Sequence, residues 1–348
     1  MIRMKDVAKH AGVSVATVSN VITGKHLVSE LIRMRVLNSM RELNYNINLV
    51  ARGLKTQRTN TIGVILPDVT KLFFLDVLKG IMETAVAENY NINIYSSNFN
   101  FETERALVNA LHSSRVDGII LDTCVDRKRG AEWARDLSIA GIYSPPVVSI
   151  ECRMDAGRVS AVVVDSNYWS SRITQHLIDT GRRRIFFITG LAHIEHEYDR
   201  LEGYKETLKK NGLPVLEELI AGGNFLSGMA YDTICRALER GIHFDAIQAS
   251  NDQAAIGAIK ALSEHDIAVP EDVAVCGFDD LFPSTLITPA ITTISIPRYE
   301  MGVTAMREVL RRIRDKNASP SQYVLNAEFI VRASSCADIK TTWNLENW

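Results

Sequence analysis

The side chains whose chemistry is easiest to interpret lie near the N-terminus, between residues 14 and 20. This stretch brings together small, methyl-bearing and hydrogen-bonding side chains, namely Val15, Ala16, Thr17, Ser19 and Asn20. Side chains of these types suit recognition by apolar contact and hydrogen bonding when one surface presents them together. A short helix with these residues on its outer side would provide that surface.

Two short helices joined by a tight turn are predicted around this stretch. Their apolar positions follow helical spacing, with Val7, Ala8 and Ala11 in the first helix and Val18, Val21 and Ile22 in the second. Gly12 can adopt the positive φ that ends the first helix. Ser14 can then accept a backbone N–H at the start of the second helix. The pattern is a helix-turn-helix whose second helix can enter a major groove, which favours a DNA-binding regulator over an enzyme.

A third helix and the distribution of charge support a separate N-terminal head. The helix is predicted from about Ser29 to Leu43, with Ile32, Val36 and Met40 on its apolar face. Residues 1–60 contain ten Lys and Arg against three Asp and Glu, whereas residues 61–348 contain 29 against 38. A basic all-α head on an acidic body suits a head that contacts phosphates.

Composition and motifs restrict the class of protein further. Hydrophobic residues make up 46% of the 348 residues and charged residues 23%, which is ordinary for a globular chain of two or three domains. The five cysteines form no CxxC pair, no apolar run approaches a membrane span, and no secretory signal is present. We therefore expect a cytoplasmic protein with no membrane partner. The sequence contains no GxGxxG, GxxxxGK[ST] or GxSxG, so neither an enzyme nor a bound cofactor is predicted.

From Thr61 onward, short apolar runs alternate with longer amphipathic stretches. Strands are predicted at Ile62–Leu66, Ile92–Tyr95, Gly118–Leu121, Val147–Ile150, Ala161–Val164, Ile185–Thr189, Ala246–Ala249, Val273–Cys276 and Thr292–Ile296. Helices are predicted between most of them, for example at Leu75–Glu88, Glu102–Leu111, Ser171–Asp179, Ala254–Glu264 and Tyr299–Arg314. Such alternation is typical of an α/β body with parallel, doubly wound sheets that carry helices on both faces.

About ten strands are many for one open sheet, so the body is predicted to have two lobes. The head is expected at residues 1–46 and a linker at 47–60. The N-terminal lobe is expected to comprise residues 61–160 with 291–320, and the C-terminal lobe residues 161–290 with 321–340. A small ligand would then bind between the lobes, at the carboxyl ends of the strands.

Blocks of residues along nearly the whole chain carry a further pattern. They are Asp6-Val7-Ala8, Ala11-Gly12-Val13-Ser14, Thr17-Val18-Ser19, Leu43-Asn44-Tyr45, Val50–Leu54, Thr61–Asp68, Val116–Ile120, Arg200–Tyr204, Ser250–Ala258, Val269–Val275, Gly277–Asp280 and Pro289–Ile294. In order and spacing these blocks resemble the lactose-repressor/galactose-repressor (LacI/GalR) family of bacterial transcription regulators. The resemblance implies a homodimer with a DNA-binding head and a body similar to periplasmic sugar-binding proteins.

By this resemblance, the second helix of the head reads DNA. Val15 and Ala16 would make apolar contacts, for example with a thymine methyl group, and Asn20 would bond an adenine edge or else the DNA backbone. Ser14 and Thr17 are expected to contact phosphates, which position the head without specifying sequence.

The segment after the head resembles the hinge helix of the family, which enters the minor groove as a pair in the dimer. Leu54 matches the leucine that wedges between base pairs, and Val50, Ala51, Arg52 and Lys55 lie beside it. The alternative is that Leu54 packs on the body. A helix this short is marginal alone, so we expect it to be weakly ordered until a partner holds it.

The same resemblance implies a set of ligand contacts around the cleft. They are Phe73, Phe74, Glu151, His196, Arg200, Phe225, Asn251 and Asp279. Aromatic faces combined with charged and forked groups suit the ring and the hydroxyls of a carbohydrate. Ile194 and His196 stand where the purine-binding member of the family carries polar base contacts, which argues against a purine effector. Lys71, at the predicted rim, would favour an acidic sugar or simply be solvated.

The sequence therefore predicts a repressor of sugar-utilisation genes that binds a palindromic operator as a dimer. A small sugar or sugar derivative between the lobes would change the spacing of the two hinge helices. One alternative is a sugar-binding protein without a DNA role, and another is a carbon-catabolite regulator that uses a phosphoprotein corepressor. The tail at residues 341–348 contains no heptads, which favours a dimer over a tetramer.

Overall fold

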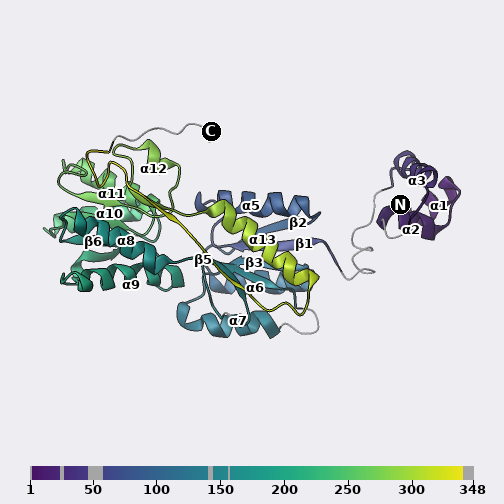
Figure 1. The fold of residues 1–348 in the computed structure, drawn as a ribbon, viewed down its shortest axis with the longest axis horizontal. Helices are drawn as coiled ribbons and strands as arrows, with labels where there is room; N and C mark the ends of the chain where they lie inside the picture. Colours follow the sequence, from purple (N-terminus) through teal and green to yellow (C-terminus); the bar gives the residue numbers. More distant parts are fainter. Residues whose placement is uncertain (1, 24–26, 46–57, 140–143, 156, 340–348) are drawn as a thin grey trace. The chain divides into compact units, whose positions relative to one another are not determined.

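The computed structural model describes residues 2–23, 27–45, 58–139, 144–155 and 157–339. The chain divides into two compact units, Met1–Thr59 and Asn60–Trp348. The first unit is a helical head and the second is an α/β body (Figure 1).

Three helices form the head: α1 (Met4–Ala11), α2 (Val15–Thr23) and α3 (Glu30–Glu42). Its buried core consists of Val7, Ala8, Ala11, Val18 and Val36. The other predicted apolar positions, Val21, Ile22, Ile32, Met40 and Leu43, are partly buried against this core. The three predicted helices and their packing faces are confirmed.

The turn between α1 and α2 has the predicted geometry. Gly12 has a φ of +63°, and its N–H is shared between the carbonyls of Ala8 and Lys9. The Ser14 hydroxyl accepts the backbone N–H of Thr17 at 3.0 Å. These two features end α1 and begin α2 within four residues. The side of α2 that faces away from the core of the head is not covered by the rest of the head.

The first lobe of the body contains a six-stranded parallel sheet in the order β11-β5-β4-β3-β1-β2. Its strands are β1 (Thr61–Leu66), β2 (Asn91–Ser96), β3 (Gly118–Asp122), β4 (Val147–Ile150), β5 (Ser160–Val164) and β11 (Gln322–Leu325). Helices α5 (Phe73–Ala87) and α13 (Arg298–Arg314) cover one face, and α6 (Phe101–Ser113) and α7 (Gly130–Ile139) cover the other (Figure 1). The inner strands are buried on both faces, which explains why most of their residues are apolar.

The second lobe contains a four-stranded parallel sheet in the order β7-β6-β8-β9. Its strands are β6 (Ile185–Thr189), β7 (Ile220–Gly222), β8 (Ala246–Ala249) and β9 (Ala274–Cys276). Helices α8 (Ser166–Asp179) and α9 (Glu195–Lys210) pack on one face, and α10 (Ser227–Glu239) and α11 (Asp252–Glu264) pack on the other. Short helical turns complete the body at η1 (Arg127–Arg129), η2 (Glu217–Leu219) and α12 (Pro283–Leu286). No helix in the described ranges is long and apolar enough to cross a bilayer.

The chain crosses between the lobes in the segments after β5, around β10 (Thr293–Ser295) and after β11. Strand β10 pairs antiparallel with β12 (Glu328–Ile330), so two of the crossings lie side by side. Beyond β10 the chain continues into α13, which returns to the first sheet as the sequence predicts.

The structure differs from the predicted lobe boundaries and adds strands. Strand β5 pairs with β4 and β11 pairs with β5, so both belong to the first sheet rather than to the second lobe. The first crossing therefore falls after Val164 rather than at residue 160. Strands β7, β11 and β12 were not predicted, because they are short and incompletely buried. A local apolar pattern also does not reveal which sheet a strand joins, since strand pairing is a long-range contact.

Candidate functional site

The carboxyl ends of both parallel sheets carry polar residues that meet between the lobes. In the first lobe, β3 ends at Asp122 and β4 is followed by Glu151. In the second lobe, β8 is followed by Asn251 and β9 by the loop that contains Asp279. Because parallel strands all end at the same edge, these side chains converge although they are distant in sequence.

A cavity of about 620 Å³, open to solvent on one side, lies at this junction. Its walls include every predicted ligand contact, namely Phe73, Phe74, Glu151, His196, Arg200, Phe225, Asn251 and Asp279. The structure thus brings the predicted residues together around one space.

Several wall residues were not predicted as ligand contacts. They are Pro67, Phe99, Asp122, Thr123, Gln253 and Leu281, and Lys71 and Ile194 also line the cavity. Asp122 and Thr123 directly follow the apolar run Gly118–Leu121, so their position at the carboxyl end of a predicted strand was a usable signal. Phe99 follows the loop after β2 and has no comparable local signal.

Unusual backbone conformations hold four of the wall residues. Phe99, Glu151, Phe225 and Asp279 have φ values of +55°, +61°, +61° and +106°, although none of them is glycine. Such conformations cost energy and persist where surrounding contacts enforce them, often at functional sites. At Gly190 a Cβ would lie 2.1 Å from the Phe225 ring, so the absence of a side chain there makes room for this ring.

Arg200 is the centre of charge in the cavity. Its Nη2 lies 3.8 Å from a carboxylate oxygen of Glu151 and 3.8 Å from one of Asp279. These distances are too long for hydrogen bonds. Its Nη1 donates to the carbonyl of Ser250 at 2.8 Å, and its guanidinium lies 3.9 Å from the centre of the Phe278 ring. The guanidinium is therefore oriented by the protein while part of its donor capacity faces the cavity.

The carboxyl groups around Arg200 are harder to ionise than in water. Burial raises the pKa of Glu151 to about 7, against the opposing attraction of Arg200. Burial likewise raises the pKa of Asp279 to about 6. Burial, followed by the proximity of Glu151 and Glu104, raises the pKa of Asp122 well above its ordinary value. Burial lowers the pKa of His196 to about 3, so this ring is neutral near pH 7.

Five buried polar atoms around the cavity have no hydrogen-bond partner within the described part of the chain. They are Asp122 Oδ1, Glu151 Oε1, His196 Nδ1, Arg200 Nε and Ser250 Oγ. Such atoms cost free energy unless a ligand or water satisfies them. The set includes both donors and acceptors, as a polyhydroxy ligand requires.

Aromatic rings form the apolar part of the walls. Phe73 and Phe74, the first residues of α5, meet edge to face with ring centres 5.2 Å apart. The ring centres of His196 and Phe225 lie 6.0 Å apart, with planes inclined at 35°. The cavity therefore offers aromatic surfaces next to charged groups.

In the head, the outer side of α2 is the candidate DNA-binding surface. Ser14, Val15 and Ala16 are exposed, and Thr17 and Asn20 are partly exposed. All of them lie on or next to the helix that the sequence assigned to a major groove. The hinge-helix residues Val50, Ala51, Arg52, Leu54 and Lys55 lie outside the described residues.

Comparisons with known proteins agree with both units. The model described as "Bacterial regulatory proteins, lacI family" matches residues 3–48, and the model described as "Periplasmic binding protein-like domain" matches residues 174–335. The HTH-type transcriptional regulator RegA of Clostridium saccharobutylicum is 34% identical over 333 residues, which cover 95% of this chain and 98% of RegA.

Solved structures match the whole architecture. The lac repressor dimer bound to operator and the anti-inducer ONPF has a TM-score of 0.85 at 24% identity, and the match covers 96% of this chain and 99% of that chain. A complex of the transcriptional regulator CelR with cellobiose has a TM-score of 0.71 at 27% identity, covering 96% and 100% of the two chains.

A helix-turn-helix head combined with a two-lobed body that encloses a cavity defines a class of bacterial gene regulators. This chain belongs to the LacI family of that class, since its relatives match it over nearly their full length. It is a DNA-binding transcriptional regulator.

Proposed function

We propose that this regulator is a repressor that binds a palindromic operator as a homodimer, and that an uncharged sugar in the cavity changes its operator affinity. The observation that supports this proposal is the cavity between the lobes, where charged and amide groups converge beside aromatic walls. This mixture suits the hydroxyls and the apolar ring faces of a carbohydrate. The CelR neighbour, which was solved with cellobiose, gives a precedent for a sugar in this fold.

The charges in the cavity favour an uncharged sugar over an acidic or phosphorylated one. Asp122, Glu151 and Asp279 line the cavity, and Arg200 already lies beside two of them. Lys71 also lines it, but its ammonium acts on Asp68 as well: against the effect of burial, hydrogen bonds from Thr70 and then the charge of Lys71 lower the pKa of that carboxyl. Near pH 7, Asp279 with a pKa of about 6 is mostly ionised and Glu151 with a pKa of about 7 is partly ionised. A bound anion would compete with these two carboxylates for Arg200 where water screens charge poorly, which disfavours it.

A thermal-shift screen of the full-length protein tests this ligand class. The panel is D-ribose, D-glucose, D-galactose, cellobiose, gluconate and glucose 6-phosphate. We expect at least one of the uncharged sugars to raise the melting temperature and both anions to leave it unchanged, because binding to the native state alone stabilises it. Stabilisation by an anion without any response to the uncharged sugars would contradict the proposal, as would chemical conversion of a panel sugar by the protein.

We propose that α2 reads the operator, with Val15, Ala16 and Asn20 at base edges and Ser14 and Thr17 at phosphates. Asn20→Ala should reduce affinity for a duplex selected from a random library by roughly 10- to 100-fold and relax preference at one base pair. Lys5→Ala is the matched phosphate-type control, since Lys5 is exposed on the head. It should weaken binding evenly across sequences and reduce the salt dependence. Fluorescence anisotropy on the selected and single-base variant duplexes distinguishes the two patterns.

We propose that the dimer forms through the outer side of α5 and the neighbouring edge strand β2. Leu75, Met82 and Val86 follow one face of α5 and are 53%, 43% and 75% exposed, and Ile94 of β2 is 40% exposed. An apolar stripe of this kind on the surface marks a contact with another protein. The lac repressor neighbour, which was solved as a dimer, supports a second copy of the chain as the partner.

A further inference from the structure

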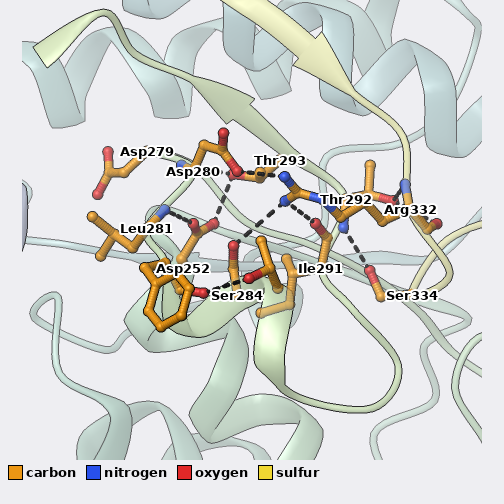
Figure 2. Close-up of polar contacts among 12 residues, drawn as sticks. Asp252, Asp279, Asp280, Leu281, Ser284, Ile291, Thr292, Thr293, Arg332 and Ser334 are labelled. Atoms are coloured by element: carbon orange, nitrogen blue, oxygen red, sulfur yellow. Dashed lines mark hydrogen bonds and ion pairs between the residues drawn. The ribbon is translucent and has the colours of Figure 1, made fainter. Parts of the chain in front are cut away.

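The loop after β9 is held in a strained shape by contacts from the second lobe. Asp279 and Asp280 have φ values of +106° and +55°. The Asp252 carboxylate accepts the N–H of Leu281 at 2.7 Å and the hydroxyl of Thr293 at 2.7 Å (Figure 2). The loop is therefore tied to the start of α11 and to the β10 crossing.

Arg332, which follows β12 in the last crossing between the lobes, also restrains this loop. It donates to Asp280 Oδ1 at 2.7 Å and to the carbonyl of Ile291 at 2.9 Å, and its backbone exchanges hydrogen bonds with the Thr292 hydroxyl (Figure 2). The loop is held by hydrogen bonds to Asp280 and Leu281, so the carboxylate of Asp279 remains available to the cavity. The loop thus joins a cavity wall to two crossings between the lobes.

Arg298 connects this loop to the first lobe. It is the first residue of α13, and its guanidinium donates to the carbonyl of Asp279 and, at 3.3 Å, to the carbonyl of Asp280. The same guanidinium donates to Asp76 Oδ2 at 3.2 Å from Nε and 3.0 Å from Nη2. Asp76 lies on α5, three residues after the cavity residue Phe73. One side chain therefore bridges the backbone of a wall residue in the second lobe and a carboxylate in the first.

Helices α5 and α13 pack with their backbones in contact at two positions. A Cβ at Gly80 would lie 2.2 Å from the carbonyl oxygen of Tyr299, and a Cβ at Gly302 would lie 2.0 Å from that of Val77. The two backbones are in direct contact at both glycines, with no flexible side chain between them to absorb a shift. A displacement of the N-terminus of α13 would therefore press directly on the backbone of α5.

We propose that Arg298 couples occupancy of the cavity to helix α5 and to the apolar stripe that α5 presents for dimerisation. A ligand that binds the Asp279 carboxylate adds a contact on the cavity side of this strained loop and shifts its backbone. Arg298 transmits the resulting shift of the Asp279 and Asp280 carbonyls to Asp76. Arg298 is a positioning residue, since it acts through the loop, and the inference rests on the proposed function of the preceding subsection.

Tyr299 provides a matched control for this role. Its hydroxyl donates to Glu83 at 2.7 Å, so it also joins α13 to α5. Its hydroxyl bond does not involve the loop after β9. If coupling depended on any contact between α5 and α13 rather than on the contact of Arg298 with the loop, Tyr299→Phe would impair it as much as a change at Arg298.

The test compares operator affinity with and without sugar for full-length variants. The sugar is the member of the panel D-ribose, D-glucose, D-galactose and cellobiose with the largest thermal shift, and the duplex is one selected by the wild-type protein. We expect the sugar to change wild-type affinity by at least about tenfold, and the affinities of Arg298→Met and Asp76→Asn by less than about threefold. Both variants should still bind the sugar by calorimetry, Arg298→Lys should be intermediate, and Tyr299→Phe should match wild type. The double variant should be no worse than Arg298→Met, because the two residues share one contact.

Hydrogen exchange supplies a second readout that does not need DNA. Sugar should alter exchange in α5 of the wild-type protein and not in α5 of Arg298→Met, while both show protection near the cavity. Full coupling in Arg298→Met, or equal loss in Tyr299→Phe, overturns this inference and leaves the proposed function intact. A wild-type protein that binds sugar without any change in operator affinity overturns both.

Discussion

At the scale of residues, one buried guanidinium lies among the carboxyl groups of the cavity. Arg200 lies between Glu151 and Asp279 and is 3% exposed. Without it, the buried carboxyl groups would face one another with no opposite charge between them. Its unpartnered Nε and the two long ion pairs leave donors that a sugar hydroxyl can use.

Arg200→Met should therefore lower the affinity for the panel sugar by at least about 100-fold, corresponding to roughly 2.7 kcal/mol. Both the hydrogen bonds to the ligand and the orientation of the neighbouring carboxylates would be lost. Isothermal titration calorimetry measures the change directly. Lys205→Met, on the same helix but outside the cavity wall, is the control and should bind as wild type. Equal affinity in Arg200→Met would remove Arg200 from the ligand site.

The raised pKa of Glu151 predicts a dependence of stability on pH. The carboxyl titrates at about 7 in the folded protein and near 4.5 when unperturbed, so between these values only the folded state keeps the proton. Stability of the ligand-free protein therefore falls as pH rises through this window. Glu151→Gln stays neutral and lacks this fall, so between about pH 5 and pH 8 it should gain roughly 1–3 kcal/mol relative to wild type.

Melting curves of the two proteins at a series of pH values check this prediction. Other acids with a raised pKa, such as Asp279 and Glu197, remain in both proteins, so their own titration contributes to both curves and the difference reports on position 151. A difference that does not vary with pH would contradict the assignment.

The candidate site shows what a sequence can reveal about residues. Arg200, Asn251 and Asp279 lie in blocks with a recognisable pattern, and the structure brings all three to one cavity. Asp122 directly follows the predicted strand Gly118–Leu121, so its place at the carboxyl end of a strand was a usable signal that was not used. That it lies near Glu151 depends on the pairing of β3 with β4, a long-range contact that no local pattern around residue 122 encodes.

At the scale of elements, helix α5 has one side that packs against α13 and another that is exposed and apolar. Its inner side needs Gly80 for direct contact with α13, whereas its outer side presents Leu75, Met82 and Val86 to solvent in the single chain. Exposed apolar side chains at helical spacing have no role in the fold of the monomer, which favours their use in the dimer.

Met82→Asp should therefore convert the dimer into a monomer without unfolding it. A charge buried in an apolar contact is costly, whereas the same charge on the free monomer is solvated. Light scattering after size-exclusion chromatography measures the mass. Val324→Asp places the same charge at an exposed position on β11, the strand at the opposite edge of the sheet from β2, and should remain dimeric. A dimeric Met82→Asp protein would move the contact elsewhere.

The elements also show where sequence patterns fail. Strands with unbroken apolar runs, such as Val147–Ile150 and Ile185–Thr189, were predicted at their observed bounds because helices cover both faces. Strand β11 alternates between exposed and partly buried residues at an edge, and β12 has only three residues, so both were missed. Their formation depends on the crossings between lobes, which neither hydrophobic period nor turn residues specify.

At the scale of the whole molecule, we propose that recognition of DNA combines two weak contacts. The head has a small core of five fully buried apolar residues, and its α2 offers few groups that can discriminate bases. The resemblance assigns a second contact to the segment around Leu54, outside the described residues. An apolar side chain with no core of its own can be buried in a kinked base step, which also orders the segment that carries it.

Leu54→Ala should therefore lower affinity for the selected operator by roughly 10- to 100-fold. Unstacking a base step costs a few kcal/mol, and the shortened side chain no longer fills the opened step to offset that cost. Binding to random duplex should change little, since it depends on phosphate contacts. Leu54→Met, which keeps a long apolar side chain, should restore most of the specific affinity. Sugar binding and the mass of the dimer should equal those of wild type in both variants. If Leu54→Ala bound the operator normally but lost stability, Leu54 would instead pack on the body, and the link between the cavity and DNA would have to run through the head alone.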